Sequence, residues 1–156
     1  MNMLIFRSAT LGAVLLALSF VAPAPAAPPQ QSAPQSPSLY KRLGGYDALA
    51  AVTDDFIGRL ASDAQIGRFF KGASTDSQKR IRQHVVDFLC QATGGPCLYM
   101  GRDMKTAHTG LNITEEDWTA SVKHLVATLD KFKVPDKEKN EVLAAVSSLK
   151  PDIVGR

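Results

Sequence analysis

Residues 101–111 read GRDMKTAHTGL, and this short stretch decides how the chain is interpreted. The run from Met104 to Gly110 predicts at most two turns of helix between loop signals on both sides. His108 stands near the end of this helix, which is an unusual place for a core histidine. Neutral imidazole binds iron well, and a neighbouring loop allows the ring to be aimed at a metal. His108 is therefore a candidate metal ligand at a pocket wall, and core packing is the alternative.

The sequence on both sides of this stretch predicts helices. Apolar residues recur at spacings of three and four, which is the period of an amphipathic helix, and we find no strand alternation and no internal repeat. Thr114 and Asp117 form a start like a capping box, with Asp in place of Glu. Asp47 and Asp136 are expected to cap two further helices. The fold class is all-α, with helices expected at about 39–43, 47–62, 76–93, 104–110, 114–133 and 136–150.

A second histidine lies on the helix expected at about 76–93. Its apolar side is expected to carry Ile81, Val85, Phe88 and Leu89, with Val86 on one flank. His84 shares a face with the first three of these, because residues three or four apart are neighbours on a helix. Such a face suits a pocket wall with one polar group near a metal. The alternative is that His84 is half exposed, and His124 is expected at the surface or rim.

The N-terminal part of the chain predicts export. Arg7 precedes the apolar run LGAVLLALSFV at 11–21, which is too short to span a bilayer comfortably, and small residues follow up to Ala26. We expect a signal peptide over 1–26, a disordered linker rich in Pro, Gln and Ser over 27–38, and a folded domain over 39–156. The expected location is the periplasm, with no stable membrane insertion of the mature protein. An uncleaved membrane anchor is the alternative.

Charge and cysteine content narrow the function classes further. The net charge is +3, and basic residues are scattered among acidic ones, which argues against binding of nucleic acid. Cys90 and Cys97 flank a flexible stretch with two glycines, so a local disulfide is expected in an oxidising compartment. Two free thiols are the alternative. Two cysteines without CxxC spacing make a poor metal site.

From Leu39 to about Ile153 the chain resembles the group I truncated haemoglobins. The resemblance rests on the order and spacing of several short motifs, which are Leu39-Tyr40, Leu43-Gly44-Gly45, Asp55-Phe56, Phe69-Phe70, Gly94-Gly95-Pro96, Tyr99-x-Gly101-x-x-Met104-x-x-x-His108, Gly110-Leu111-x-Ile113-Thr114 and Lys133-Val134-Pro135. It implies a two-over-two helical sandwich around haem b, with His108 as the proximal iron ligand. The further residues that it places against the porphyrin are Phe70, Ile81, His84, Val85, Phe88, Met104, Ala107, Ile113 and Trp118. The absence of CxxCH argues against a c-type haem attachment.

The chain departs from this family on the side where the gas binds. Many group I members stabilise bound O2 with a tyrosine and a glutamine, whereas Ile57, Ile81 and Val85 stand in the distal positions here. Each missing hydrogen bond would be expected to stabilise the bound ligand by about 1.5–3 kcal/mol. His84 falls where some cyanobacterial members place a second iron ligand. It is therefore a candidate distal ligand, and its alternative roles are hydrogen bonding to a haem propionate or gating of water.

Four functions follow from this interpretation. The first is reversible binding of O2, or of NO or CO, to haem. The second is NO dioxygenase or peroxidase-like detoxification, which would need an external reductase because the chain has no flavin or nicotinamide motif. The third is electron transfer through a six-coordinate haem, and the fourth is a helical interaction module without haem. We expect a protein that binds gas, and not a self-sufficient enzyme.

Overall fold

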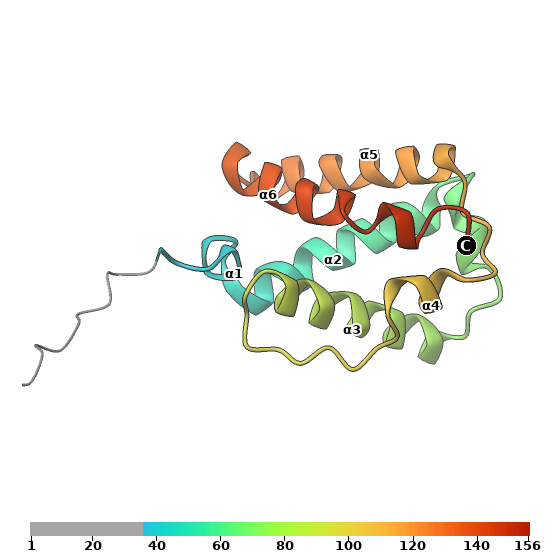
Figure 1. Cartoon of the computed structure of the whole chain (residues 1–156), viewed down its shortest axis with the longest axis horizontal. Coiled ribbons are helices and arrows are strands. Elements are labelled where there is room, and N and C mark those ends of the chain that lie inside the picture. Colours follow the sequence, from blue (N-terminus) through green and yellow to red (C-terminus); the bar gives the residue numbers. More distant parts are fainter. Residues whose placement is uncertain (1–35) are drawn as a thin grey trace, which may run out of the picture. The chain divides into compact units, whose positions relative to one another are not determined.

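Six α-helices and two short 3-10 helices make up residues 36–156, the part of the chain that the computed structural model describes. Figure 1 shows them in chain order as α1 (Leu39–Arg42), α2 (Gly45–Ser62), η1 (Ile66–Phe70), α3 (Thr75–Ala92), α4 (Met104–His108), α5 (Glu115–Lys131), α6 (Asp136–Ser147) and η2 (Lys150–Asp152). This range contains no strand, so the all-α prediction is confirmed. The predicted signal peptide, 1–26, and nearly all of the predicted linker, 27–38, lie outside the described residues.

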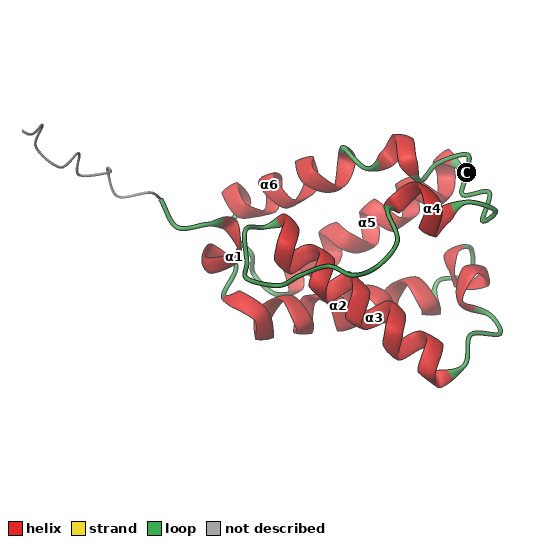
Figure 2. Cartoon of the chain, turned by 60° about the horizontal axis from the view of Figure 1, so that its bottom comes forward, coloured by secondary structure: helices red, strands yellow, loops and turns green. Residues whose placement is uncertain are grey.

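The four long helices form two packed pairs. Helix α5 runs beside α6, and α3 packs on α2, while α2 also packs against α5 and joins the two pairs (Figure 1). The short helix α4 lies apart from these pairs and contacts η2. Figure 2 shows the long loop 93–103 that carries the chain from the end of α3 to α4. This arrangement is the two-over-two sandwich that the sequence predicts.

The helix starts follow local chemistry, and three of them differ from the prediction. Asp136 was expected to cap α6, but it is the first residue of that helix, Pro135 occupies the N-cap position, and no side chain caps this end. Gly44 has φ 96°, a left-handed conformation that glycine adopts without strain, and α2 starts directly after it instead of at Asp47. Helix α3 starts at Thr75 because the Ser74 side chain accepts a hydrogen bond from the backbone N–H of Ser77. The predicted capping box at the start of α5 is confirmed, with both reciprocal hydrogen bonds between Thr114 and Asp117.

The core has two parts. One joins α2, α5 and α6 through Val52, Leu125, Leu129 and Val142. The other lies on α3, where Val86 and Cys90 are completely buried. Val86, expected on one flank of the apolar side of α3, is thus part of the core. Helix α3 has two apolar faces, because one packs on α2 while the other, with Ile81 and Val85, lines a cavity.

The loop after α3 is held tightly against the helix end. The structure joins Cys90 to Cys97, and the backbone N–H of Gly95 donates to the carbonyl of Cys90 at 2.8 Å. A Cβ atom at Gly95 would lie 2.6 Å from the ring of Tyr40, so no larger residue fits there. This close packing fixes the start of the path that leads to α4. None of the helices within residues 36–156 combines the length and apolar character needed to cross a membrane.

Candidate functional site

An apolar cavity of about 270 Å³ lies between α2, α3, α4 and α5. Its wall includes aromatic side chains from α2, η1 and α5, namely Phe56, Phe69, Phe70 and Trp118, and aliphatic side chains from seven segments. Besides the indole N–H of Trp118, only three polar side chains line it: His108, Asp117 and Ser121. A cavity with apolar walls and few polar groups is typical of a site for a large, flat, mostly apolar cofactor.

His108 is the only histidine in the cavity wall, and its hydrogen bonding leaves one nitrogen free. Its Nδ1 lies 2.7 Å from the carbonyl oxygen of Met104, one turn earlier in α4. Because a carbonyl can only accept, Nδ1 must carry the proton. The lone pair of a neutral His108 ring is then on Nε2, ready for a metal, and the hydrogen bond fixes the tautomer and makes the ring more basic.

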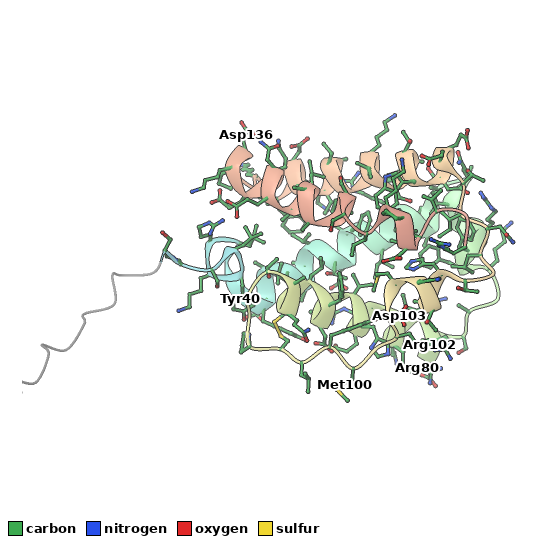
Figure 3. The ribbon with its side chains drawn as sticks, in the orientation of Figure 1. Tyr40, Arg80, Met100, Arg102, Asp103 and Asp136 are labelled. Carbon is green, nitrogen blue, oxygen red and sulfur yellow. A yellow bond between two sulfur atoms is a disulfide. The ribbon has the colours of Figure 1, made fainter. Side chains whose placement is uncertain are left out.

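Local structure on both sides of His108 holds α4 in place. Asp103 caps the helix, since its carboxylate accepts the backbone N–H of Thr106 at 2.8 Å and the Thr106 hydroxyl at 2.7 Å. These two hydrogen bonds hold the pKa of Asp103 below its usual range. Figure 3 shows Asp103 and Arg102 at the start of α4. A helix of five residues would not be stable alone, so these contacts are needed to position the imidazole.

The chain after α4 is tied to the C-terminal residues. The backbone N–H of Asn112 donates to the carbonyl of Arg156 at 2.8 Å, and that of Gly155 donates to the carbonyl of Ile113 at 2.9 Å. Leu111, Ile113 and Ile153 from these two segments all line the cavity. We call the wall made by α4, residues 109–113 and residues 153–156 the His108 wall.

The wall made by α2 and α3, which we call the α2–α3 wall, has no hydrogen-bond donor in its side chains. Phe56, Ile57 and Leu60 come from α2, and Ile81 and Val85 come from α3. The three residues predicted for the distal pocket, Ile57, Ile81 and Val85, thus share the cavity with His108. Ile81 is 39% exposed, so this wall has an opening toward solvent.

A buried carboxylate fixes the corner between η1 and α5. Asp117 is 1% exposed, and it accepts hydrogen bonds from the Thr114 backbone at 3.0 Å, the Gln65 amide at 2.7 Å and the Arg68 guanidinium at 2.5 Å. Burial alone would raise the pKa of Asp117, but these hydrogen bonds outweigh it and lower the pKa to about 2. The group is ionised and fully bonded at neutral pH, and it holds Phe69, Phe70 and Trp118 in the wall.

His84 lies outside the cavity wall, packed against Tyr99. The ring centroids of the two residues are 6.0 Å apart and the planes are nearly perpendicular, and Phe88 meets the same tyrosine at 5.3 Å. The Tyr99 hydroxyl donates to the carbonyl of Arg102 at 2.6 Å. Tyr99 therefore bridges from α3 to the residues just before α4, and His84 is exposed on the outer side of this bridge.

The structure gathers most of the residues predicted from sequence, but not all. Six of the ten predicted porphyrin contacts line the cavity: Phe70, Ile81, Val85, His108, Ile113 and Trp118. His84, Phe88, Met104 and Ala107 do not, and Phe88 lines a second cavity against α6 instead. Sequence reasoning missed Asp117 and Ser121 as polar wall residues. Their signal was weak, because both fall on a helix face that also carries Trp118 and Leu125.

The donor set fits haem better than a bare metal ion. Within the described residues no group of three or more His, Cys, Asp or Glu side chains could hold a metal ion. A transition metal bound by protein alone usually needs three or four such ligands. A porphyrin supplies four nitrogens itself and asks the protein for one axial ligand and apolar walls. His108 can provide the axial ligand, and the aromatic side chains of the cavity provide the apolar walls.

Comparison with known proteins gives the same picture over most of the chain. Residues 38–154 match the family model described as bacterial-like globin. The chain is 35% identical over 116 residues to the group 1 truncated haemoglobin GlbN of Mycolicibacterium paratuberculosis, which covers 74% of this chain and 83% of that protein. It is 31% identical over 119 residues to the group 1 truncated haemoglobin of Tetrahymena pyriformis, which covers 76% and 96%.

Solved structures of similar proteins share the fold. The truncated haemoglobin from Tetrahymena pyriformis in its Fe(III) form superposes with a TM-score of 0.70 at 31% identity, over 77% of this chain and 100% of that one. The 2/2 haemoglobin from Synechococcus, solved in the cyanomet state with covalently attached haem, gives a TM-score of 0.69 at 30% identity, over 77% and 100%.

Proposed function

Since the chain belongs to the bacterial-like globin family, as a haem-binding globin of the truncated type, we propose that it holds haem b through His108 and binds a diatomic gas such as O2 reversibly. The observation that carries this proposal is the free Nε2 of His108 in an otherwise apolar cavity, with Nδ1 bonded to the Met104 carbonyl at 2.7 Å. Bound haem would supply an iron atom with one open position for the gas.

The side chains of the two cavity walls would have different roles. His108 would donate its Nε2 lone pair to the metal, while the Met104 carbonyl keeps the ring from turning. The aromatic side chains of η1 and α5 would cover the flat faces of the cofactor and exclude water. Ile57, Ile81 and Val85 would face the gas without donating to it. We therefore expect O2 to dissociate faster than from a pocket with two hydrogen-bond donors.

A direct test is the uptake of haem by the purified full chain. We expect titration with haemin to saturate at one haem per chain and to produce a Soret band. His108→Gly should weaken this uptake strongly, while His124→Gln should leave it unchanged, because His124 bonds to Asp63 outside the cavity. A folded wild-type chain that takes up no haem would contradict the proposal.

We propose His84 as a distal ligand only in a rearranged state. In the described structure its ring packs on Tyr99 and is exposed, so ligation would require His84 to leave Tyr99 and turn inward. The ferrous spectrum tests this directly. A six-coordinate, low-spin spectrum that becomes five-coordinate in His84→Ala would support ligation, and a five-coordinate spectrum in both proteins would refute it.

We also propose that the chain is exported, with residues 1–26 removed and Cys90 joined to Cys97. The supporting features are the apolar run at 11–21 and the short path between the two cysteines, since disulfides persist in oxidising compartments. Mass spectrometry of the protein from its native host, with and without reduction before alkylation, tests both points. An intact N-terminus or two alkylated cysteines without reduction would contradict them.

A further inference from the structure

Three polar side chains and the indole N–H of Trp118 line the cavity, and two of the three polar side chains already have a role. His108 is the proposed iron ligand. Both carboxylate oxygens of Asp117 accept hydrogen bonds, one from Gln65 and the other from Arg68 and the Thr114 backbone. The remaining polar residue is Ser121, which lies one turn after Asp117 on α5. Its hydroxyl and the indole N–H of Trp118 are the two side-chain donors in the wall with capacity left for a ligand, and of these only the hydroxyl can turn between two acceptors.

The Ser121 hydroxyl can turn toward the cavity at little cost. It now donates to the backbone carbonyl of Asp117 at 2.8 Å. That carbonyl lies within α5, where it is also in position to accept the backbone N–H of Ser121 four residues later. The carbonyl therefore stays satisfied when the hydroxyl turns away. A serine bonded back to its own helix in this way is a donor that can switch between two acceptors.

The α2–α3 wall offers a ligand no donor that would compete with Ser121. Helix α5 packs on α2, and the lining residues from α2 and α3 are Phe56, Ile57, Leu60, Ile81 and Val85, all without polar side-chain atoms. A ligand atom with unshared electron pairs gains most from a hydrogen bond where the surrounding walls are apolar. The Ser121 hydroxyl can therefore influence how fast each ligand dissociates.

We propose that Ser121 donates a hydrogen bond to the gas held in this cavity and so selects O2 over CO. This inference rests on the proposed haem function. On haem iron O2 would be polarised and so become a good hydrogen-bond acceptor, whereas CO would remain a poor one. Loss of the hydroxyl should therefore affect O2 much more than CO.

The test compares gas dissociation from the full, haem-loaded chain and its variants. Ser121→Ala should raise the O2 dissociation rate about three- to tenfold, which corresponds to one neutral hydrogen bond. The CO dissociation rate should change by less than about twofold. Ser121→Thr keeps the hydroxyl and should restore the slower release of O2. Thr119→Ala is the matched control, since Thr119 makes the same kind of bond to the Glu115 carbonyl on the exposed side of α5.

The outcomes separate this inference from the proposed function. If the wild-type chain takes up no haem, both fail. If all variants take up haem equally but Ser121→Ala releases O2 at the wild-type rate, or accelerates O2 and CO alike, this inference alone is overturned. If Ser121→Ala does not fold, Ser121→Cys replaces it, because a thiol of similar size is a weaker donor and should give a smaller increase for O2 only.

Discussion

The two walls of the cavity are held in place by different interactions. The His108 wall is built from short segments fixed by hydrogen bonds, from the Asp103 cap through the bond of His108 to Met104 and on to the pairing of residues 112–113 with 155–156. The α2–α3 wall is built from long helices that pack through completely buried side chains such as Val86 and Cys90. Its lining side chains contribute only apolar contacts to the cavity.

This difference separates holding the cofactor from choosing the gas. A ligating imidazole must be held in one orientation, and hydrogen bonds fix the short segments around it. Apolar helix faces need no such aiming, and a single residue there can change without moving the helix. Substitutions in the His108 wall should therefore alter stability and haem retention, whereas substitutions at the inner face of α3 should alter ligand kinetics.

The largest expected effect on stability comes from the corner that joins the walls, at Asp117. Asp117→Ala removes the capping box of α5 and the acceptor for Gln65 and Arg68. We expect the free energy of unfolding to fall by about 3 kcal/mol, measured by chemical denaturation. Glu116→Ala, an exposed neighbour in the same helical turn, should have a much smaller effect. Equal effects of the two substitutions would contradict the role assigned to Asp117.

The next effect is on the rate of O2 dissociation and concerns the α2–α3 wall alone. Ile81→Gln would place an amide donor on α3, facing the cavity that Ile81 lines. We expect O2 dissociation to slow by about tenfold or more, as one additional hydrogen bond to a polarised ligand implies. The size-matched control is Ile81→Leu, for which stopped-flow measurements should show little change. An unchanged rate in Ile81→Gln would mean that this face of α3 does not reach the gas.

A smaller effect is expected where the C-terminal residues support the His108 wall. Gly155 has φ 70°, and a Cβ atom there would meet nothing within 4 Å, so Gly155→Ala introduces only backbone strain. We expect a loss of about 1 kcal/mol in stability together with faster loss of haem. Gly58→Ala is the opposite control, because Gly58 lies within α2 with free space around it and should become more stable. Faster haem loss in both variants would contradict the claim that the C-terminal residues support the His108 wall.

The smallest effect is a change in acid sensitivity at Asp63, where α2 ends. The backbone N–H of Ile66, the His124 ring and the backbone N–H of Gln65 lower the pKa of Asp63 from 3.8 to about 2. A carboxylate with a lowered pKa stabilises the fold above its ordinary pKa, and this stabilisation is lost as the pH falls through the folded value. Asp63→Asn should therefore reduce stability at neutral pH and flatten its decline between about pH 4 and pH 2.

Circular dichroism during acid titration measures this decline. Asp47→Asn serves as the control because Asp47 is an exposed carboxylate in the first turn of α2. An Asp63→Asn curve as steep as that of the wild type between these pH values would show that Asp63 does not contribute.

Sequence patterns were most informative for features that depend only on neighbouring residues in the chain. The capping box at Thr114 and Asp117, the short helix that ends at His108 and the turn at Gly44 all follow from neighbours within four residues. These local features depend on helix period and capping chemistry, which a single sequence displays directly. That Ile57, Ile81 and Val85 would share one pocket was instead implied by the resemblance to group I truncated haemoglobins.

Features that depend on distant partners could not be predicted in the same way. Val86 is completely buried because α3 packs on α2, and nothing within its own helix indicates which of two apolar faces does so. His84 shares a helix face with cavity residues, but Tyr99, fifteen positions later, meets it on the outer side. Asp117 was expected only as a cap, although Gln65 and Arg68 make it part of the cavity corner.

The most direct measurement of the central claim is the resonance Raman spectrum of the ferrous, gas-free protein. The account predicts a stretching band between iron and an imidazole that is present in the wild type and absent in His108→Gly. Added free imidazole should restore it at a different frequency, as the bond to the Met104 carbonyl is then missing. A band that persists unchanged in His108→Gly would show that another residue holds the iron.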